Sequence, residues 1–285
     1  MCENAVNARV PVAVPGARGS SPLLKKVAGA VAATAALGAA TAAYGHFIEL
    51  NNFQLRTESL PVLPAGSPDF RILHISDMHM IPGQQKKIDF MHSLATLEPD
   101  LVMNTGDNLS HVDGMGPLLE ALDPLMDFPG VFVPGSNCYF APVFKNPARY
   151  LWQPRTPQMI EEGSRVALPI ERMHEAFESR GWTGLINRYD TLNLKGLRLE
   201  FSGVDDPHLR YDEHPGFAPG AFDEGDEPSV RIGVAHAPYM RTLHHFVQDG
   251  AQAIFAGHTH GGQVCLPGGH ALVSNCDLPP SRAKG

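Results

Sequence analysis

The sequence predicts a mixed α/β (α+β) fold in which two packed mixed β-sheets are flanked by helices, an αββα sandwich. Two observations indicate this fold. Strand–helix–strand patterns begin and end the long C-terminal part of the chain, and segments with strand character joined by short turns lie between them. The composition fits a folded domain, since 43% of the 285 residues are hydrophobic and 18% are charged.

The first predicted unit is a strand, a helix and a second strand. Residues 71–76 form a short apolar strand, residues 84–97 carry apolar side chains near helical spacing, and residues 100–105 form a buried strand. Strands connected in this way are parallel neighbours, so their carboxyl ends should lie side by side. Ligands bind at that edge of open α/β sheets.

The middle of the chain is predicted to be less regular. A short helix at about 116–126 leads to a strand at 130–134. Residues 141–168 carry much proline and charge and indicate a long surface loop. A helix over 169–180 follows, with proline near its start and glycine just after its end.

The remaining elements are short. Three antiparallel strands joined by tight turns are predicted before an acidic loop rich in proline and glycine, and a strand–helix–strand unit follows the loop. These elements are predicted at residues 185–188, 191–194 and 197–204, and then at 230–235, 240–248 and 253–256.

The N-terminal segment differs in composition from the rest. Residues 1–26 are predicted to be a disordered basic region, residues 27–48 an uncharged transmembrane anchor or signal segment, and residues 49–69 a linker to the domain at 70–285. The uncharged run is about long enough to span a thin bilayer, but its alanines and glycines make it only weakly apolar. An uncleaved anchor, a cleaved signal and a soluble alanine-rich helix all remain open.

Basic residues are concentrated before the apolar run. By the positive-inside rule this favours a single-pass protein of the cell membrane with a cytoplasmic N-terminus and the main domain outside. The alternatives are a secreted or a cytoplasmic protein. The net charge of −8 argues against a nucleic-acid partner, which would favour a basic surface.

The cysteines do not form a disulfide framework. Cys2, Cys138, Cys265 and Cys276 are scattered, and there is no Cys-x-x-Cys. A bridge between Cys265 and Cys276 and two free thiols are both open.

Oxygen and nitrogen donors gather at the predicted carboxyl ends of the strands. They are Asp77, His79, Asp107, Asn137, His236, His258 and His260. Such a set suits two borderline or hard divalent metals better than one structural zinc. A carboxylate shared by two metals would hold them about 3.5–4 Å apart.

The order of these residues closely resembles the calcineurin-like metallophosphoesterase superfamily, whose motifs are D-x-H, G-D, G-N-H or a variant, a lone H, and G-H-x-H. The corresponding segments are Asp77-Met78-His79, Gly106-Asp107-Asn108, Gly135-Ser136-Asn137-Cys138, His236 and Gly257-His258-Thr259-His260. The resemblance covers about residues 70–285. The apolar N-terminal run and His-Thr-His-Gly-Gly-Gln resemble the membrane-associated bacterial branch.

The resemblance implies a metallophosphoesterase sandwich and a metal-dependent phosphoesterase with two divalent ions, Mn, Fe, Zn or Mg. It assigns one metal to Asp77, His79, Asp107 and His260. The other metal would be held by Asp107 (bridging), Asn137, His236 and His258. The catalytic set would be Asp107, Asn137, Cys138 and His236, with a metal-bridging hydroxide attacking phosphorus.

Three departures from the family pattern affect this interpretation. Ser136 is inserted before Asn137, and Cys138 stands where most members carry a histidine that protonates the leaving group. A thiol with a reference pKa near 8.5 suits that role less well than an imidazole, which favours phosphodiester or pyrophosphate substrates over monoesters. The chain ends soon after His260, so the last strands of the sandwich are expected to be missing.

The substrate and partners are less defined. His111, Asp206 and His208 are predicted to line the substrate cleft, and Arg149 could contact a phosphate. The expected partners are a phosphorylated small-molecule or lipid-linked substrate and, through the N-terminal segment, the membrane. The alternative function is a metal-binding but catalytically weak, membrane-anchored scaffold or binding protein.

Overall fold

A computed structural model of the chain describes residues 22–143, 165–219, 229–262, 264–266 and 270–284. The chain divides into two compact units, Met1–Gln54 and Leu55–Gly285. The predicted disorder of the first residues, Cys2, Arg149 and most of the predicted 141–168 loop lie outside the described residues.

The N-terminal unit contains the helix α1 (Pro22–Phe47) and the short 3-10 helix η1 (Glu49–Asn51). The segment Lys25–Asn51 is long and apolar enough to cross a membrane, with a mean hydropathy of 1.5, although signal sequences and buried helices pass the same test. The hydroxyls of its two threonines donate hydrogen bonds to the helix backbone: Thr34 Oγ1 donates to Ala30 O at 3.0 Å and Thr41 Oγ1 to Leu37 O at 2.9 Å. Such bonds hide polar groups within the helix.

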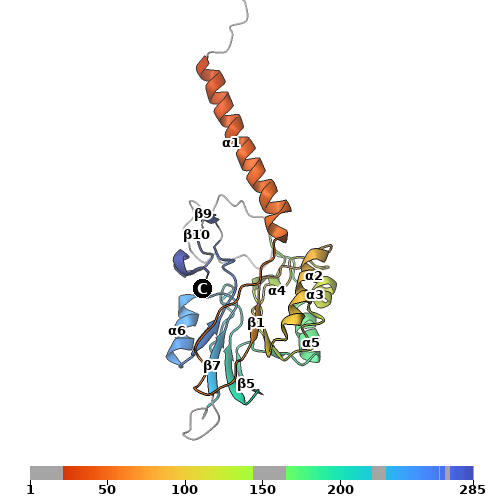
Figure 1. Cartoon of the computed structure of the whole chain (residues 1–285), viewed down its shortest axis with the longest axis vertical. Helices are drawn as coiled ribbons and strands as arrows, with labels where there is room; N and C mark the ends of the chain where they lie inside the picture. Colours follow the sequence, from red (N-terminus) through yellow and green to blue (C-terminus); the bar gives the residue numbers. More distant parts are fainter. Residues whose placement is uncertain (1–21, 144–164, 220–228, 263, 267–269, 285) are drawn as a thin grey trace, which may run out of the picture. The chain divides into compact units, whose positions relative to one another are not determined.

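The second unit is built on two four-stranded sheets and a small hairpin (Figure 1). The first sheet has the order β1 (Ile72–Ile75), β2 (Leu101–Asn104), β3 (Gly130–Phe132) and β4 (Thr183–Gly184). The second has the order β5 (Arg188–Leu194), β6 (Leu197–Gly203), β7 (Ser229–Val234) and β8 (Ala253–Phe255). The hairpin pairs β9 (Val264–Leu266) with β10 (His270–Val273), and the 3-10 helix η5 (Pro280–Arg282) follows.

The strand pairing follows the predicted units. All neighbours in the first sheet are parallel, as are β6–β7 and β7–β8, whereas β5 and β6 form an antiparallel hairpin. At its turn Lys195 and Gly196 have φ of 51° and 75°, the left-handed backbone of a tight two-residue hairpin.

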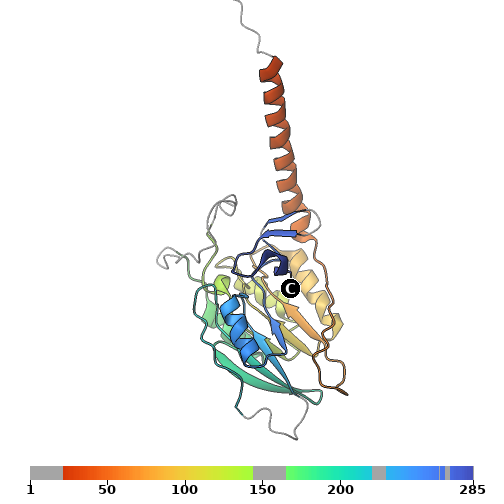
Figure 2. The same ribbon diagram turned by 90° about the vertical axis from the view of Figure 1, so that its left-hand side faces the viewer.

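Helices cover the outer faces of both sheets (Figures 1 and 2). The helices α2 (Gln85–Leu94), which continues into the 3-10 turn η2 (Ala95–Leu97), α3 (Met115–Leu122) and α5 (Ile170–Ser179) pack on the first sheet through one core. On the second sheet, Phe246 of α6 (Met240–Gln248) packs against Val204 and Ala235. The predicted αββα sandwich is therefore confirmed.

The two cores meet at β2, where side chains alternate between faces. Leu101 and Met103 belong to the core between the sheets, together with Phe201 of β6, whereas Val102 faces the helices. All four side chains are fully buried. Truncating a buried phenylalanine such as Phe201 to alanine would cost about 3–5 kcal/mol.

One element prediction was wrong. A turn was predicted between strands at 185–188 and 191–194. Tyr189 and Asp190, which would form it, instead lie inside the continuous strand β5, and residues 183–184 join the other sheet as β4. β5 is an edge strand with one partly exposed face, where polar side chains are tolerated. Asp190 is held there by Arg188 at 2.6 Å.

Candidate metal centre

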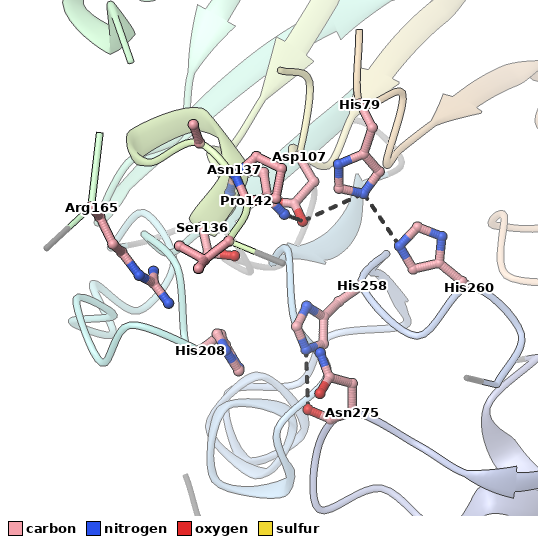
Figure 3. A pocket seen from close by; sticks show the side chains of 12 residues that line it. His79, Asp107, Ser136, Asn137, Pro142, Arg165, His208, His258, His260 and Asn275 are labelled. Carbon is pink, nitrogen blue, oxygen red and sulfur yellow. Dashed lines mark hydrogen bonds and ion pairs between the residues drawn. The ribbon is translucent and has the colours of Figure 1, made fainter. Parts of the chain in front are cut away.

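The polar side chains that the sequence singled out lie just beyond the carboxyl ends of strands from both sheets. In chain order they are Asp77 and His79 after β1, Asp107 after β2, Asn137 in the short helix α4 (Ser136–Tyr139) after β3, His236 after β7, and His258 and His260 after β8. Five of them, His79, Asp107, Asn137, His258 and His260, line one cavity (Figure 3). The fold therefore brings together residues that are up to 183 positions apart.

Five of these residues have left-handed backbone conformations, which non-glycine residues rarely adopt. The φ angles are 54° at Asp77, 46° at His79, 51° at Asp107, 70° at His258 and 51° at His260. Backbone hydrogen bonds hold the first two turns in place, since Asp77 N–H donates to Gly106 O at 2.8 Å and His79 N–H to Asp107 O at 2.9 Å. Strained backbone of this kind clusters at functional sites.

Asp77, His79 and His260 form the first triad of potential metal ligands. Asp77 Oδ1 lies 3.4 Å from His260 Nε2, and His79 Nε2 lies 3.3 Å from the same nitrogen. Asp77 Oδ1 is buried without a hydrogen-bond partner, while Asp77 Oδ2 accepts from Ser76 at 2.6 Å. An orphaned carboxylate oxygen facing two imidazole nitrogens fits a divalent cation.

Asp107, His236 and His258 form the second triad, which is buried. His236 Nδ1 lies 2.7 Å from the carbonyl oxygen of Thr105, and His258 Nε2 lies 3.2 Å from that of Asn275. Because carbonyls only accept, these ring nitrogens carry the protons. The opposite nitrogens, His236 Nε2 and His258 Nδ1, lie 3.2 Å apart, with Asp107 Oδ2 3.3 Å from His236 Nε2. Two ring nitrogens and a carboxylate oxygen that converge in this way also fit a divalent metal.

Asp107 lies where the two triads meet. Its Oδ2 is 3.3 Å from His236 Nε2 and 3.8 Å from His79 Nε2, and it accepts from Asn137 Nδ2 at 2.7 Å. Burial alone would raise the pKa of Asp107, but His236, His79 and the Asn137 N–H outweigh it and lower that pKa. The carboxylate is therefore ionised and available to both triads.

The histidine pair of the second triad is electrostatically asymmetric. Burial opposes protonation of His236, but the charge and hydrogen bond of Asp107 raise its pKa to about 10. Burial, together with His236 and His208, lowers the pKa of His258 to about 3. Asp107 therefore favours the protonated form of His236, and metal binding at this ring nitrogen would compete with that proton.

Two glycines leave room for these carboxylates. A Cβ on Gly135 would lie 2.4 Å from Asp107 Oδ1 and 2.6 Å from the His236 ring. A Cβ on Gly257 would collide with the Ser76 hydroxyl and lie 2.5 Å from Asp77 Oδ2. Both positions require glycine because side chains of the site pack directly on the backbone there.

Cys138 does not reach the cavity. Its thiol is fully buried in the core beneath the site, where it accepts weak hydrogen bonds from Asn108 N at 3.5 Å and Asn108 Nδ2 at 3.8 Å. Burial and the charge of Asp107 raise the pKa of Cys138 to about 12. Its neighbours Ser136 and Asn137 line the cavity instead.

The cavity has a volume of about 250 Å³ and joins both triads to a second wall (Figure 3). Its lining residues are His79, Asp107, Ser136, Asn137, Ala141, Pro142, Val143, Arg165, His208, His258, His260 and Asn275. The sequence did not single out Ser136, Arg165 and Asn275 as cavity-lining residues. Ser136 had a signal, as the insertion in the third motif.

Of the three predicted substrate contacts, the structure brings only His208 to the cavity. Asp206 is fully buried, and its carboxylate accepts from the backbone N–H of His208 at 3.0 Å and of Leu209 at 3.2 Å, so it shapes the turn that carries His208. His111 is exposed and accepts from the N–H of Asp113 at 3.1 Å. His208 Nδ1 lies 3.0 Å from Tyr239 Oη.

The two other cysteines in the described part of the chain are free thiols. Cys265 is exposed and Cys276 is buried, and neither forms a disulfide. Of the alternatives left open by the sequence, the structure therefore has the two free thiols.

The two sheets carry two acidic–histidine triads at their strand ends, and both donor sets fit divalent metals. Residues 70–262 match the family model of the calcineurin-like phosphoesterases, and the chain belongs to this family. It is accordingly a metal-dependent phosphoesterase, a hydrolase acting on phosphorus ester bonds.

Two individual proteins show weaker similarity to the chain. The chain is 27% identical over 215 residues to the uncharacterized protein YpbG of Bacillus subtilis (strain 168), which covers 74% of this chain and 69% of that protein. The crystal structure of TT1561 of Thermus thermophilus is similar with a TM-score of 0.38 and 12% identity, covering 66% of this chain and 81% of that one.

Proposed function

We propose that the chain is a two-metal hydrolase that cleaves phosphodiester or pyrophosphate bonds in preference to simple monoesters. The observation that carries this proposal is the position of Asp107, whose Oδ2 lies within 3.8 Å of a histidine from each triad. A carboxylate oxygen so placed can serve two cations at once.

The proposed ligands of the first metal are Asp77, His79, Asp107 and His260, and those of the second are Asp107, Asn137, His236 and His258. When bound there, two divalent ions (Mn, Fe, Zn or Mg) would make water a nucleophile at neutral pH and offset the charge that builds up on the phosphoryl oxygens.

The residues around the ligands fix the ring orientations. The Thr105 and Asn275 carbonyls hold His236 and His258, and Ser110 Oγ lies 3.0 Å from His79 Nδ1. Each contact occupies one ring nitrogen and leaves the other for a ligand role. Outer contacts of this type raise ligand basicity, and their loss typically costs about 10–100-fold in metal affinity or activity.

The preference for diesters or pyrophosphates rests on Cys138. Where most of the family carries an acidic imidazole, this chain has a buried thiol whose pKa is raised to about 12. A proton held there is not offered to a leaving group in the cavity. Substrates whose leaving group departs readily as an anion fit this site better than alkyl monoesters do.

We further propose that α1 anchors the protein in the membrane, as in the membrane-associated bacterial branch that the sequence resembles, with the N-terminus in the cytoplasm and the phosphoesterase domain outside. Lys25 and Lys26 before the apolar run support this orientation. A phosphorylated small molecule or a lipid-linked phosphate at the membrane surface would then be the substrate. Protease treatment of intact spheroplasts tests it: the domain should be degraded, and protection would refute this topology.

Hydrolysis of bis-p-nitrophenyl phosphate with Mn²⁺ tests the activity. We expect turnover that D107N abolishes, whereas D113N, an exposed carboxylate a few residues along the same loop, retains it. Two bound metals with no turnover on any phosphate substrate would instead favour the metal-binding scaffold.

A further inference from the structure

Arg165 is held on the cavity wall by a strand-like contact with the segment that follows α4. Phe140 and Ala167 form an isolated antiparallel bridge. Beside it, Ala141 N–H donates to Val166 O at 2.9 Å and Leu168 N–H donates to Tyr139 O at 2.8 Å. The backbone next to Arg165 is therefore tied to the same segment that presents Asn137.

The guanidinium of Arg165 has few partners of its own. Its Cζ lies 5.5 Å from the centroid of the Phe140 ring, a cation–π contact that orients it. Its Nε is buried without a hydrogen-bond partner, and within the described ranges no carboxylate forms an ion pair with it. A buried donor in this state requires an acceptor from elsewhere.

Arg165 is also the only lysine or arginine among the twelve described residues that line the cavity. The chain has a net charge of −8, so an anionic group of the substrate that lies beyond the metal ligands needs a local permanent cation to bind it. In Figure 3 the guanidinium faces the cavity from the wall beyond Ser136, on the side away from His79 and His260.

We propose that Arg165 binds a second anionic group of the substrate, a phosphate next to the phosphoryl group that is cleaved at the triads. The preferred substrates are then pyrophosphates rather than isolated phosphodiesters. The planar fork of arginine matches two phosphate oxygens at once, which lysine cannot do. This inference deepens the proposed function and rests on it.

The test compares two non-hydrolysable probes on the Mn²⁺-loaded protein by isothermal titration calorimetry: methylenediphosphonate, with two anionic groups, and methylphosphonate, with one. R165M should weaken binding of methylenediphosphonate roughly 10- to 100-fold and that of methylphosphonate less than about threefold, as expected for loss of charge-assisted hydrogen bonds. R165K should recover part of the loss. R172M, on an exposed arginine of α5, should change neither.

Equal weakening of both probes would place Arg165 on the reacting phosphoryl group and overturn the proposal, as would no change in either. Thermal melts of R165M and R165K establish that the variants are folded. Failure of the proposed function is a separate result, because it would be seen as absent turnover of bis-p-nitrophenyl phosphate by the unmodified protein.

Discussion

Replacing Gly135 by alanine tests whether the metal centre depends on close packing of Asp107 against the backbone. Gly135 has φ −124° and ψ 176°, an extended conformation that alanine adopts freely, so the substitution adds no backbone strain. The new Cβ would lie 2.4 Å from Asp107 Oδ1 and 2.6 Å from the His236 ring. The effect is therefore a purely steric one on the two groups at the centre of the site.

The magnitude follows from these distances. Restoring a contact of 3.4 Å moves Asp107 or the α4 backbone by about 1 Å. Overpacking of this kind costs about 1–3 kcal/mol of stability, and a 1 Å displacement of reacting groups can cost about 10²-fold in rate. We expect G135A to lose both Mn²⁺ affinity and activity while remaining folded.

Gly116 provides the matched control. It lies within α3, where an added Cβ meets nothing within 4 Å, so G116A should gain about 0.5–1 kcal/mol and keep full activity. Urea denaturation, Mn²⁺ titration calorimetry and initial rates measure the three quantities on each variant. Metal affinity and activity of G135A within twofold of the unmodified protein would show that the centre does not depend on this close packing.

Three further outcomes are expected. Removal of metal by EDTA should lower the stability of the phosphoesterase domain, and Mn²⁺ at 100 times its Kd should restore about 2.7 kcal/mol in thermal melts. Equal melting temperatures with EDTA and with Mn²⁺ would contradict a metal that binds only to the folded state. Burial lowers the pKa of His174, which packs on Phe132, below its reference value of 6.5. The folded state then binds fewer protons than the unfolded one, so the stability of the protein is full above pH 6.5 and falls as the pH drops below it. Urea titrations at pH 5 and 7.5 should show a smaller loss of stability in H174M than in the unmodified protein. An equal loss in both would contradict the burial of His174. In thiol labelling read by mass spectrometry, exposed Cys265 should react in the native protein and buried Cys138 only after unfolding, so rapid native labelling of Cys138 would contradict its position.

Much of the fold could be predicted because its main signals are local. The apolar runs and helical spacing on either side of Asp77 and Asp107 specify parallel units, and Lys195-Gly196 specifies a hairpin turn. The failure at Tyr189-Asp190 has a tertiary cause. Whether a polar pair turns or stays extended depends on its place at a sheet edge, which the local sequence does not encode.

Some residues of the candidate site could likewise be predicted from the sequence and others could not. Residues at the carboxyl ends of strands could be predicted because strand direction alone places them at one edge, and this holds for Asp77, Asp107 and His236. Arg165 could not, because its place depends on a bridge across a long loop, between Phe140 and Ala167.

The same limit applies to side-chain direction. Sequence order placed Cys138 at the position of a proton donor, but the turn of α4 directs its thiol into the core. Likewise Asp206 and His208 lie close together in the chain, yet only His208 lines the cavity while Asp206 supports its turn.

The number of metals bound per chain, measured by inductively coupled plasma mass spectrometry after dialysis, is the sharpest test of a carboxylate shared by two metals. We predict two divalent ions per chain in the unmodified protein and a loss of affinity at both sites in D107N, because Asp107 Oδ2 lies between the triads. One ion per chain, or two ions retained at unchanged affinity in D107N, would contradict a shared carboxylate at Asp107.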